Sequence, residues 1–416
     1  MKEFTQEKIN ILNNINDKAK ELFDQHDYSG AIKCFEQIGV EDFPEEFKPN
    51  LARCYYYNRQ APKALELLAS CKSLGDTDTQ LDAAIYENAI GNFDFALQVY
   101  ETLDQSDSRV RFNIGWHLMR KGNFKKAFEL LEEGSKCRAW GHEYIHLEND
   151  KIDIKKRWHG NQTQTLLLFL EGGIGDCLIF LRWSDYLKTK CKKLIIAVPE
   201  KLCRLLSNAG YDVIPDYSIP TLEYDHYVPG MSIPNFIDVN HPLDKVRLPY
   251  VQSISEPYIT RGMDILSSEK NKNLKIGVKW MGNPEFEHDQ FRTIPKQAFY
   301  DLNLYGSLFS LQLEENEDDD HFIPCRHVIK DWQDTYSVFS GLDLLVTSCT
   351  STAHLAGAMN LPTIVIVPLV CYFVWANDDL RWYESVTVVR QTKYNDWSDA
   401  ITNMYSLVES FANKYK

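Results

Sequence analysis

The chain has 416 residues, which favours two or three domains because a single hydrophobic core rarely grows to that size. Its 59 acidic and 45 basic residues give a net charge of -14, which argues against a protein that depends on broad attraction to nucleic acid or anionic membranes. The ten cysteines are scattered without a CxxC pair and the N-terminus lacks an apolar signal core, so we expect a soluble cytoplasmic protein without a membrane span.

The first 140 residues contain a repeated pattern. An alanine recurs at intervals of 33, 32 and 31 residues, at positions Ala31, Ala64, Ala96 and Ala127. A period in this range predicts a helical solenoid in which each unit buries its apolar face against its neighbours.

The segments IGNFDFALQVYETL and KGNFKKAFELLEEG in this region resemble tetratricopeptide (TPR) repeats. The resemblance covers about residues 15–135 and implies a concave surface for a peptide, a protein partner or another subunit. An array that mainly braces the next domain or dimerises is an equally open alternative. Residues 141–164 predict a linker that lies over the surface, with Trp158 just before the first strand.

The stretch 165–187 predicts the start of an α/β region. An apolar run from Leu166 to Leu170 indicates a buried strand, and a glycine turn leads into an apolar series at helical spacing. The turn glycines are Gly172, Gly173 and Gly175. Their spacing is not GxGxxG and no Walker lysine follows, which argues against a nicotinamide enzyme and a P-loop kinase.

Further strands and helices alternate along the rest of the chain. Strands are predicted at 193–199, 211–215, 308–313, 342–348 and 362–367, with a helix at 202–210 and loops over 216–262. This alternation predicts mostly parallel, doubly wound sheets in two successive nucleotide-type lobes. We therefore expect an α/β protein with an N-terminal all-α solenoid (1–140), a linker (141–164), a first Rossmann-like lobe (165–262) and a second Rossmann-like lobe with a C-terminal helix (263–416).

Four motifs follow one another in this α/β region: GGIGDCLIF, GVKWMGNPEFEHDQFRTIP, FSLQ and TSCTSTAHLAGAMNLPTIVIVP. In this order they resemble the heptosyltransferase family and its TPR-fused relatives, over about residues 158–400. The resemblance implies the two-lobed GT-B architecture, with the acceptor on the first lobe and a nucleotide-sugar donor on the second. It further implies an inverting glycosyltransferase that uses the nucleotide sugar as co-substrate and needs neither a metal nor another cofactor.

Asp176, in the glycine turn, matches the family's catalytic base, which removes the proton of the acceptor hydroxyl. An aspartate at a helix start is also a good N-cap, and the two roles are compatible.

A helix start in the second lobe predicts the diphosphate site. Thr350, Ser351, Thr352 and His354 combine hydroxyl groups, free backbone N–H groups and the positive helix end. A protonated His354 would stabilise charge on the leaving phosphate. Capping hydroxyls and a core histidine are the structural alternative. The chain has Cys349 where relatives often have aspartate, so the donor could differ.

The remaining candidates are less specific. Arg292 matches a phosphate-binding cation of the family, and a guanidinium suits bidentate phosphate contact. Weaker candidates for the donor side are Lys279, Asn283 and Gln312. Trp375 and Trp382 could line the sugar pocket or pack in the core.

The acceptor stays open between a glycan, a protein and a modified nucleic-acid base of the kind glycosylated in some phage genomes. Lysine-rich clusters at 151–157 and 188–193 keep a phosphorylated or nucleic-acid acceptor possible, although such runs are more often solvated. The alternative from another class is a catalytically inactive TPR scaffold that binds partners.

Overall fold

The computed structural model describes residues 5–39, 43–71, 75–149, 151–252, 274–286, 288–315 and 319–415. They form two compact units. The helical unit comprises Met1–Gln105, Pro284–Phe291 and Lys393–Asp396, and the larger unit comprises Ser106–Asn283, Arg292–Thr392 and Trp397–Lys416.

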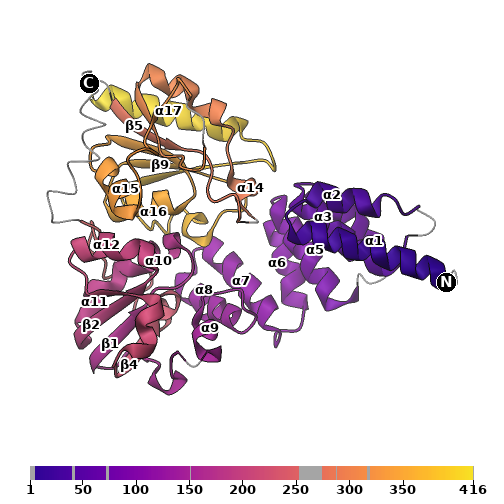
Figure 1. Cartoon of the computed structure of the whole chain (residues 1–416), viewed down its shortest axis with the longest axis horizontal. Coiled ribbons are helices and arrows are strands. Elements are labelled where there is room, and N and C mark those ends of the chain that lie inside the picture. Colours follow the sequence, from indigo (N-terminus) through magenta and orange to yellow (C-terminus); the bar gives the residue numbers. More distant parts are fainter. Residues whose placement is uncertain are drawn as a thin grey trace. The chain divides into compact units, whose positions relative to one another are not determined.

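The helical unit contains consecutive helices that pack as pairs (Figure 1). These are α1 (Gln6–Asp24), α2 (Tyr28–Phe35), α3 (Lys48–Tyr57), α4 (Ala61–Ala69), α5 (Thr77–Ala89) and α6 (Phe93–Thr102), with a short 3₁₀ helix, η2 (Glu45–Phe47). The repeat alanines Ala31, Ala64 and Ala96 are fully buried. A small side chain at these positions lets the helices of a pair approach closely. The helices listed above confirm the prediction of a helical N-terminal region.

Two segments from much later in the sequence pack on the helical unit. In the segment Pro284–Phe291, the side chain of Gln290 donates a hydrogen bond to the carbonyl of Tyr57 at the end of α3. In the segment Lys393–Asp396, Asn395 Nδ2 donates to the carbonyl of Arg59 at 2.9 Å. The chain itself therefore covers part of the surface around the α3–α4 turn.

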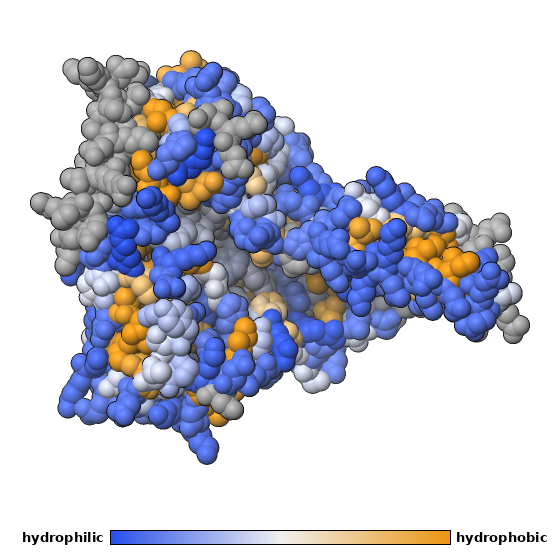
Figure 2. All heavy atoms as spheres, viewed as in Figure 1, coloured by the Kyte–Doolittle hydropathy of each residue, from blue (hydrophilic) through white to orange (hydrophobic). Residues whose placement is uncertain are grey.

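The first helix retains exposed apolar surface. Ile9 and Ile11 of α1 are 37% and 53% exposed, and Figure 2 shows apolar atoms in orange on the N-terminal helices. Among the described residues, no helix is both long and apolar enough to cross a membrane.

The larger unit begins with one more helix pair, α7 (Ser108–Arg120) and α8 (Phe124–Leu131). The predicted helical domain ended at residue 140, whereas the compact units divide after Gln105. The division falls earlier because the aromatic side chains of α7 and α8 belong to the core of the α/β region.

The segment expected to be a surface linker belongs to the larger unit and is buried at a few of its positions. It contains α9 (Glu143–Glu148) and η5 (Ile154–Lys156). Trp158 is fully buried, and its backbone N–H donates to the carbonyl of Tyr227 at 2.7 Å. Arg157 forms ion pairs with Glu132 and Glu143. Most of the described residues of 141–164 are nevertheless exposed or half-buried, as the expected surface segment would be, whereas this indole and this guanidinium find partners inside the fold.

The first lobe is a parallel sheet of four strands in the order β3-β2-β1-β4. Its strands are β1 (Thr163–Phe169), β2 (Cys191–Val198), β3 (Val213–Pro215) and β4 (His226–Pro229). Its helices are α10 (Ile174–Phe180), η6 (Leu181–Trp183), α11 (Ser184–Lys188), α12 (Glu200–Asn208), η7 (Asp216–Thr221) and η8 (Gly230–Asn235). Three of the strands and the helix over 202–210 were predicted, whereas β4 lies in the stretch expected to be loops.

The second lobe is a parallel sheet of six strands in the order β10-β9-β8-β5-β6-β7. Its strands are β5 (Leu274–Lys279), β6 (Gly306–Ser310), β7 (Ile323–Pro324), β8 (Leu344–Ser348), β9 (Thr363–Val367) and β10 (Val386–Arg390). Its helices are η9 (Lys296–Leu304), α15 (Trp332–Phe339), α16 (Ser351–Ala358), η10 (Phe373–Trp375) and the C-terminal α17 (Ser398–Tyr415), and the short α14 (Asp289–Arg292) precedes them. Two parallel sheets with helices confirm the mixed α/β class, and the predicted lobe boundary at 262 lies outside the described residues.

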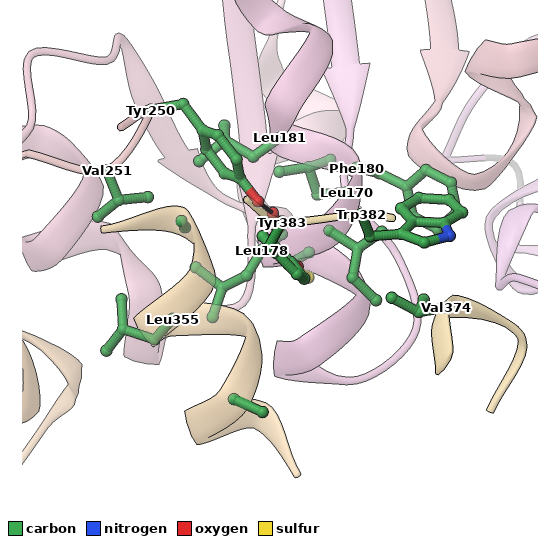
Figure 3. Packing of buried hydrophobic residues seen from close by; sticks show 14 of the residues in the cluster. Leu170, Leu178, Phe180, Leu181, Tyr250, Val251, Leu355, Val374, Trp382 and Tyr383 are labelled. Carbon is green, nitrogen blue, oxygen red and sulfur yellow. Dashed lines mark hydrogen bonds between the residues drawn. The ribbon is translucent and has the colours of Figure 1, made fainter. Parts of the chain in front are cut away.

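A shared hydrophobic core joins α8, the helices of the first lobe and part of the second lobe. Residues 371–383, which we call the aromatic loop, contribute several large side chains to this core. Figure 3 shows Leu178 of α10, Leu355 of α16 and Trp382 of the aromatic loop in this packed region. The starts of α10 and α16 are therefore held on one continuous core.

Candidate functional site

In the glycine turn after β1, the carboxyl group of Asp176 lies against the backbone of the turn glycines Gly172 and Gly173. Gly172 has a φ of +81°, and a Cβ atom there would lie 2.8 Å from Oδ2 of Asp176. The N–H of Gly173 donates to that oxygen at 2.8 Å. The N-cap of α10 is therefore Gly173, not Asp176 as one sequence interpretation had it; Asp176 is the third helical residue and its side chain accepts the N–H of that N-cap. The left-handed turn requires glycine at 172.

Gly175 lies where α10 meets α16. A Cβ atom at this position would lie 3.0 Å from Cδ2 of His354 and 3.7 Å from Cα of Ser351. Only hydrogen fits without displacing the imidazole ring. The glycine turn of the first lobe and the helix start of the second lobe, predicted separately from the sequence, therefore lie together in the larger unit.

The carboxyl group of Asp176 is half-buried and hydrogen-bonded at both oxygens. The hydroxyl of Tyr372, in the aromatic loop, donates to Oδ1 at 2.5 Å. Burial raises the pKa of Asp176 above its usual value, while the hydrogen bonds from Tyr372 and Gly173 oppose this rise. The carboxylate is therefore more basic than that of an exposed aspartate, which suits proton abstraction.

The start of α16 presents several hydrogen-bond donors. Thr350 and Thr352 are buried, and their hydroxyls hydrogen-bond one another at 2.7 Å, while that of Thr352 also lies 3.2 Å from the hydroxyl of Thr347. Across the described part of the chain, the backbone N–H groups of Ser351 and Thr352 have no hydrogen-bond acceptor. Such N–H groups at the positive end of a helix suit an anion.

Arg292 lies beside this helix start. Its Nη1 donates to the carbonyl of Cys349 at 3.1 Å, one residue before the N-cap Thr350. Cys349 itself is buried, in agreement with the interpretation of a small buried thiol. The structure therefore brings Arg292 to the hydroxyl and N–H groups with which the sequence grouped it.

His354 is buried in the first turns of α16. Its Nδ1 lies 3.0 Å from the hydroxyl of Tyr383, and its ring stacks on Trp375 with centroids 5.0 Å apart. Burial, together with the charges of Arg182 and Arg292, lowers the pKa of His354 to about 3. The ring is therefore neutral near pH 7 in this structure, so positive charge at the α16 start comes from Arg292 rather than from a protonated His354.

A hydrogen-bonded chain extends from His354 into the core. Tyr383 hydrogen-bonds Tyr250, whose hydroxyl donates to the carbonyl of Leu178 at 2.9 Å. Figure 3 shows the two tyrosine hydroxyls directed toward one another. This chain fixes the orientation of the imidazole and connects α16 to α10.

The other donor-side candidates form a separate network. Lys279 is buried at the end of β5, and its Nζ lies 3.1 Å from Oε2 of Glu314. Gln312 accepts the backbone N–H of Met281 at 3.2 Å and donates to the same Glu314 oxygen. Asn283 is exposed. The carboxylate of Glu314 therefore neutralises the charge of Lys279.

Both candidate tryptophans are core residues. Trp375 and Trp382 are each 2% exposed. Trp375 stacks on His354, whereas Trp382 lies 4.7 Å from the guanidinium carbon of Arg182. Of the two sequence interpretations, core packing describes these residues better than a sugar-pocket lining.

Sequence reasoning missed three residues around the site. Tyr372 contacts Asp176 directly. Arg182 is buried and donates from Nη1 to the carbonyl of Trp382 at 2.7 Å. Glu171, directly before the glycine turn, is 4% exposed and accepts the N–H of His142, and burial raises its pKa to about 8. The aromatic run over 371–383 was the one visible signal, and it did not say which ring reaches the turn.

The described residues contain no group of three or more His, Cys, Asp or Glu side chains that could hold a metal ion.

No protein-family model matches this chain, and no curated protein matches it. Three solved structures with similar chains are glycosyl transferases. The family 9 glycosyl transferase from Veillonella parvula is 11% identical over 61% of this chain and 90% of its own, with a TM-score of 0.40. The E. coli ADP-heptose lps heptosyltransferase II is 11% identical over 59% and 99%, with a TM-score of 0.42.

The third similar structure is a mutant of the Thermobaculum terrenum O-GlcNAc transferase. It is 9% identical over 99% of this chain and 94% of its own, with a TM-score of 0.36. Because identities and TM-scores are this low, we base the function on the residues of this chain.

Proposed function

We propose that this protein is an inverting, metal-independent glycosyltransferase that moves a sugar from a nucleotide sugar to a hydroxyl group of an acceptor. The observation that carries this proposal is the contact between the two helix starts at Gly175 and Ser351. It joins a basic carboxylate to a set of anion-binding groups, which are the two functions that glycosyl transfer needs.

Asp176 is the base in this proposal. Its carboxylate takes the proton of the acceptor hydroxyl while the hydroxyl oxygen forms a bond to the anomeric carbon of the donor sugar. The bond from that carbon to the diphosphate oxygen breaks, and the nucleoside diphosphate leaves with the electron pair. The pKa of Asp176, raised by burial, supports this role because a stronger base takes the proton more readily.

The start of α16 is the diphosphate site in this proposal. The N–H groups of Ser351 and Thr352 and the guanidinium of Arg292 stabilise negative charge as the diphosphate leaves, beside the hydrogen-bonded hydroxyls of Thr350 and Thr352. A neutral His354 contributes a hydrogen bond from its ring. With these donors in place, a metal ion is not required.

The resemblance of the four motifs to heptosyltransferases supports the GT-B arrangement of the two parallel sheets. We also propose that the N-terminal helices are TPR repeats. The packing of Gln290 and Asn395 on the α3–α4 turn means that the chain itself covers part of the surface of the helical unit there. Recruitment of an acceptor or a protein partner by the rest of the array stays a prediction, as does a cytoplasmic location.

Two questions stay open, the class of the acceptor and whether the protein is an enzyme or a scaffold. The acceptor is a glycan, a protein or a modified nucleic-acid base, and the net charge of -14 disfavours DNA. An inactive scaffold is the alternative from another class. The hydrogen bonding and raised pKa of Asp176 favour the enzyme, since a scaffold has no need of a basic carboxylate beside an anion site.

A two-step experiment tests the proposal. A thermal-shift screen with UDP, GDP, ADP, CMP and dTDP identifies the nucleotide, because a ligand that binds only the folded state raises the midpoint of unfolding. The matching nucleotide sugars are then offered with each acceptor class. Binding of one nucleotide and transfer in EDTA support the enzyme, whereas nucleotide binding without transfer or hydrolysis for any acceptor supports the scaffold.

A further inference from the structure

The aromatic loop holds the carboxyl group proposed as the base. We propose that Tyr372 is a positioning residue for Asp176, and that helix α7 keeps Tyr372 in place through Trp116. This inference rests on the proposed function for its catalytic meaning, whereas the positioning itself is a property of the fold.

Two groups fix the carboxyl group from opposite parts of the larger unit. The backbone N–H of Gly173, in the first lobe, donates to Oδ2 at 2.8 Å. The hydroxyl of Tyr372, which follows β9 in the second lobe, donates to Oδ1 at 2.5 Å. Because each oxygen has its own donor, rotation of the carboxyl group about its Cβ–Cγ bond would break both hydrogen bonds.

The ring of Tyr372 is held by the last helix pair. Trp116 of α7 meets it edge-on, with ring centroids 5.5 Å apart, and meets Phe373 in the same way at 5.8 Å. Asn377, further along the aromatic loop, donates from Nδ2 to the carbonyl of Arg120 at the end of α7 at 2.8 Å. The loop is thus attached to α7 on both sides of η10.

This arrangement leaves Asp176 able to act. A carboxylate oxygen has two lone pairs, so Oδ1 can accept both the Tyr372 hydroxyl and an acceptor hydroxyl. The tyrosine hydrogen bond stabilises the carboxylate form and so opposes the effect of burial. Without it, the carboxyl group binds its proton more tightly and is free to turn away from the acceptor.

The test replaces the hydroxyl group without disturbing the ring. Tyr372→Phe removes only the donor, and Tyr300→Phe is the matched control because Tyr300 also donates to an aspartate, Asp319 Oδ2, at 2.8 Å. Proteins labelled with ¹³C at the aspartate carboxyl carbon are titrated by NMR, and Asp176→Asn identifies the Asp176 signal. Both variants retain His142, whose positive charge when protonated would lower the pKa of Asp176, and the thiol of Cys177, whose own pKa is raised by burial and by Asp176.

We expect the midpoint of the Asp176 titration to rise by about one pH unit in Tyr372→Phe and to stay unchanged in Tyr300→Phe. Trp116→Leu should shift it in the same direction, by less, because the hydroxyl remains but its ring is less constrained. In transfer assays, the acid limb of kcat should move with the titration while KM for the donor changes less than about twofold.

An unmoved Asp176 midpoint in Tyr372→Phe would overturn the positioning role, and an unmoved midpoint in Trp116→Leu would overturn the link to α7. The titration needs no enzymatic activity, so it separates the two proposals. If the midpoint rises but the wild-type protein transfers no sugar, the positioning role stands and the proposed function fails.

Discussion

A Cβ atom on Gly175 would lie 3.0 Å from Cδ2 of His354, so the glycine turn and α16 touch at a point where only hydrogen fits. Gly175→Ala should therefore force the imidazole or α16 to move, and we expect a loss of about 1–3 kcal/mol of stability. Transfer activity should fall as well, because Asp176 and the anion site would separate. Denaturant unfolding and initial rates measure the two effects.

The matched control for this substitution is Gly75→Ala, where an added Cβ has no neighbour within 4 Å. It should change stability by less than about 1 kcal/mol. Equal stability of the two alanine variants would mean that the contact between Gly175 and His354 is not close in solution.

Glu171 should make stability depend on pH. Its pKa rises from 4.5 to about 8 on folding, mainly through burial, so between these values the folded protein binds a proton that the unfolded chain has released. The contribution of Glu171 to the free energy of unfolding is therefore fully present below about pH 4.5. It is lost as the pH rises toward about 8, by up to about 1.4 kcal/mol per pH unit.

Glu171→Gln keeps an oxygen that can accept the N–H of His142 and has no proton to release. Denaturant unfolding is measured between about pH 5 and pH 9, the range over which Glu171 titrates. As the pH rises over this range, the free energy of unfolding should fall less for the variant than for the wild-type protein. Parallel curves for the two proteins would show that Glu171 titrates normally.

Arg292 should contribute to donor binding. Removal of a charged hydrogen bond to phosphate costs about 1.5–3 kcal/mol, which corresponds to a roughly 10- to 100-fold weaker affinity for the nucleoside diphosphate in Arg292→Ala. Arg292→Lys keeps the charge and should recover part of this affinity. Isothermal titration with the nucleotide found by thermal shift measures both.

Arg247→Ala removes an exposed guanidinium of the first lobe and serves as the control. If it weakens nucleotide binding as much as Arg292→Ala, general electrostatic attraction rather than a specific contact explains the effect. If Arg292→Ala binds like the wild-type protein, the diphosphate site lies elsewhere.

The sequence predicted well those features that depend on local patterns. The apolar run from Leu166 to Leu170 largely coincides with β1, and the repeat alanines are buried where helices pack. The small residues after Thr350 form α16. Period and turn chemistry determine these elements, and both can be read from a single chain. Asp176 and His354 could be grouped because each stands in a recognisable motif.

Contacts between distant segments could not be predicted in this way. Tyr372 lies 196 positions from Asp176, and nothing in the run CYFVWANDDLRWY distinguishes it from its aromatic neighbours. The same holds for Trp158, which looked like part of a surface linker but is fully buried. The neutral state of His354 was also not visible, because it depends on burial and on the charges of Arg182 and Arg292.

The most direct test of the central claim is the release of nucleoside diphosphate from the matching nucleotide sugar, measured in EDTA with the acceptor present, for the wild-type protein and Asp176→Asn. Asparagine can still accept the N–H of Gly173 but cannot take a proton, so the variant should bind the nucleotide normally and lose about 10²- to 10⁴-fold in kcat. Release at the wild-type rate by Asp176→Asn would contradict the assignment of Asp176 as the base of a glycosyltransferase.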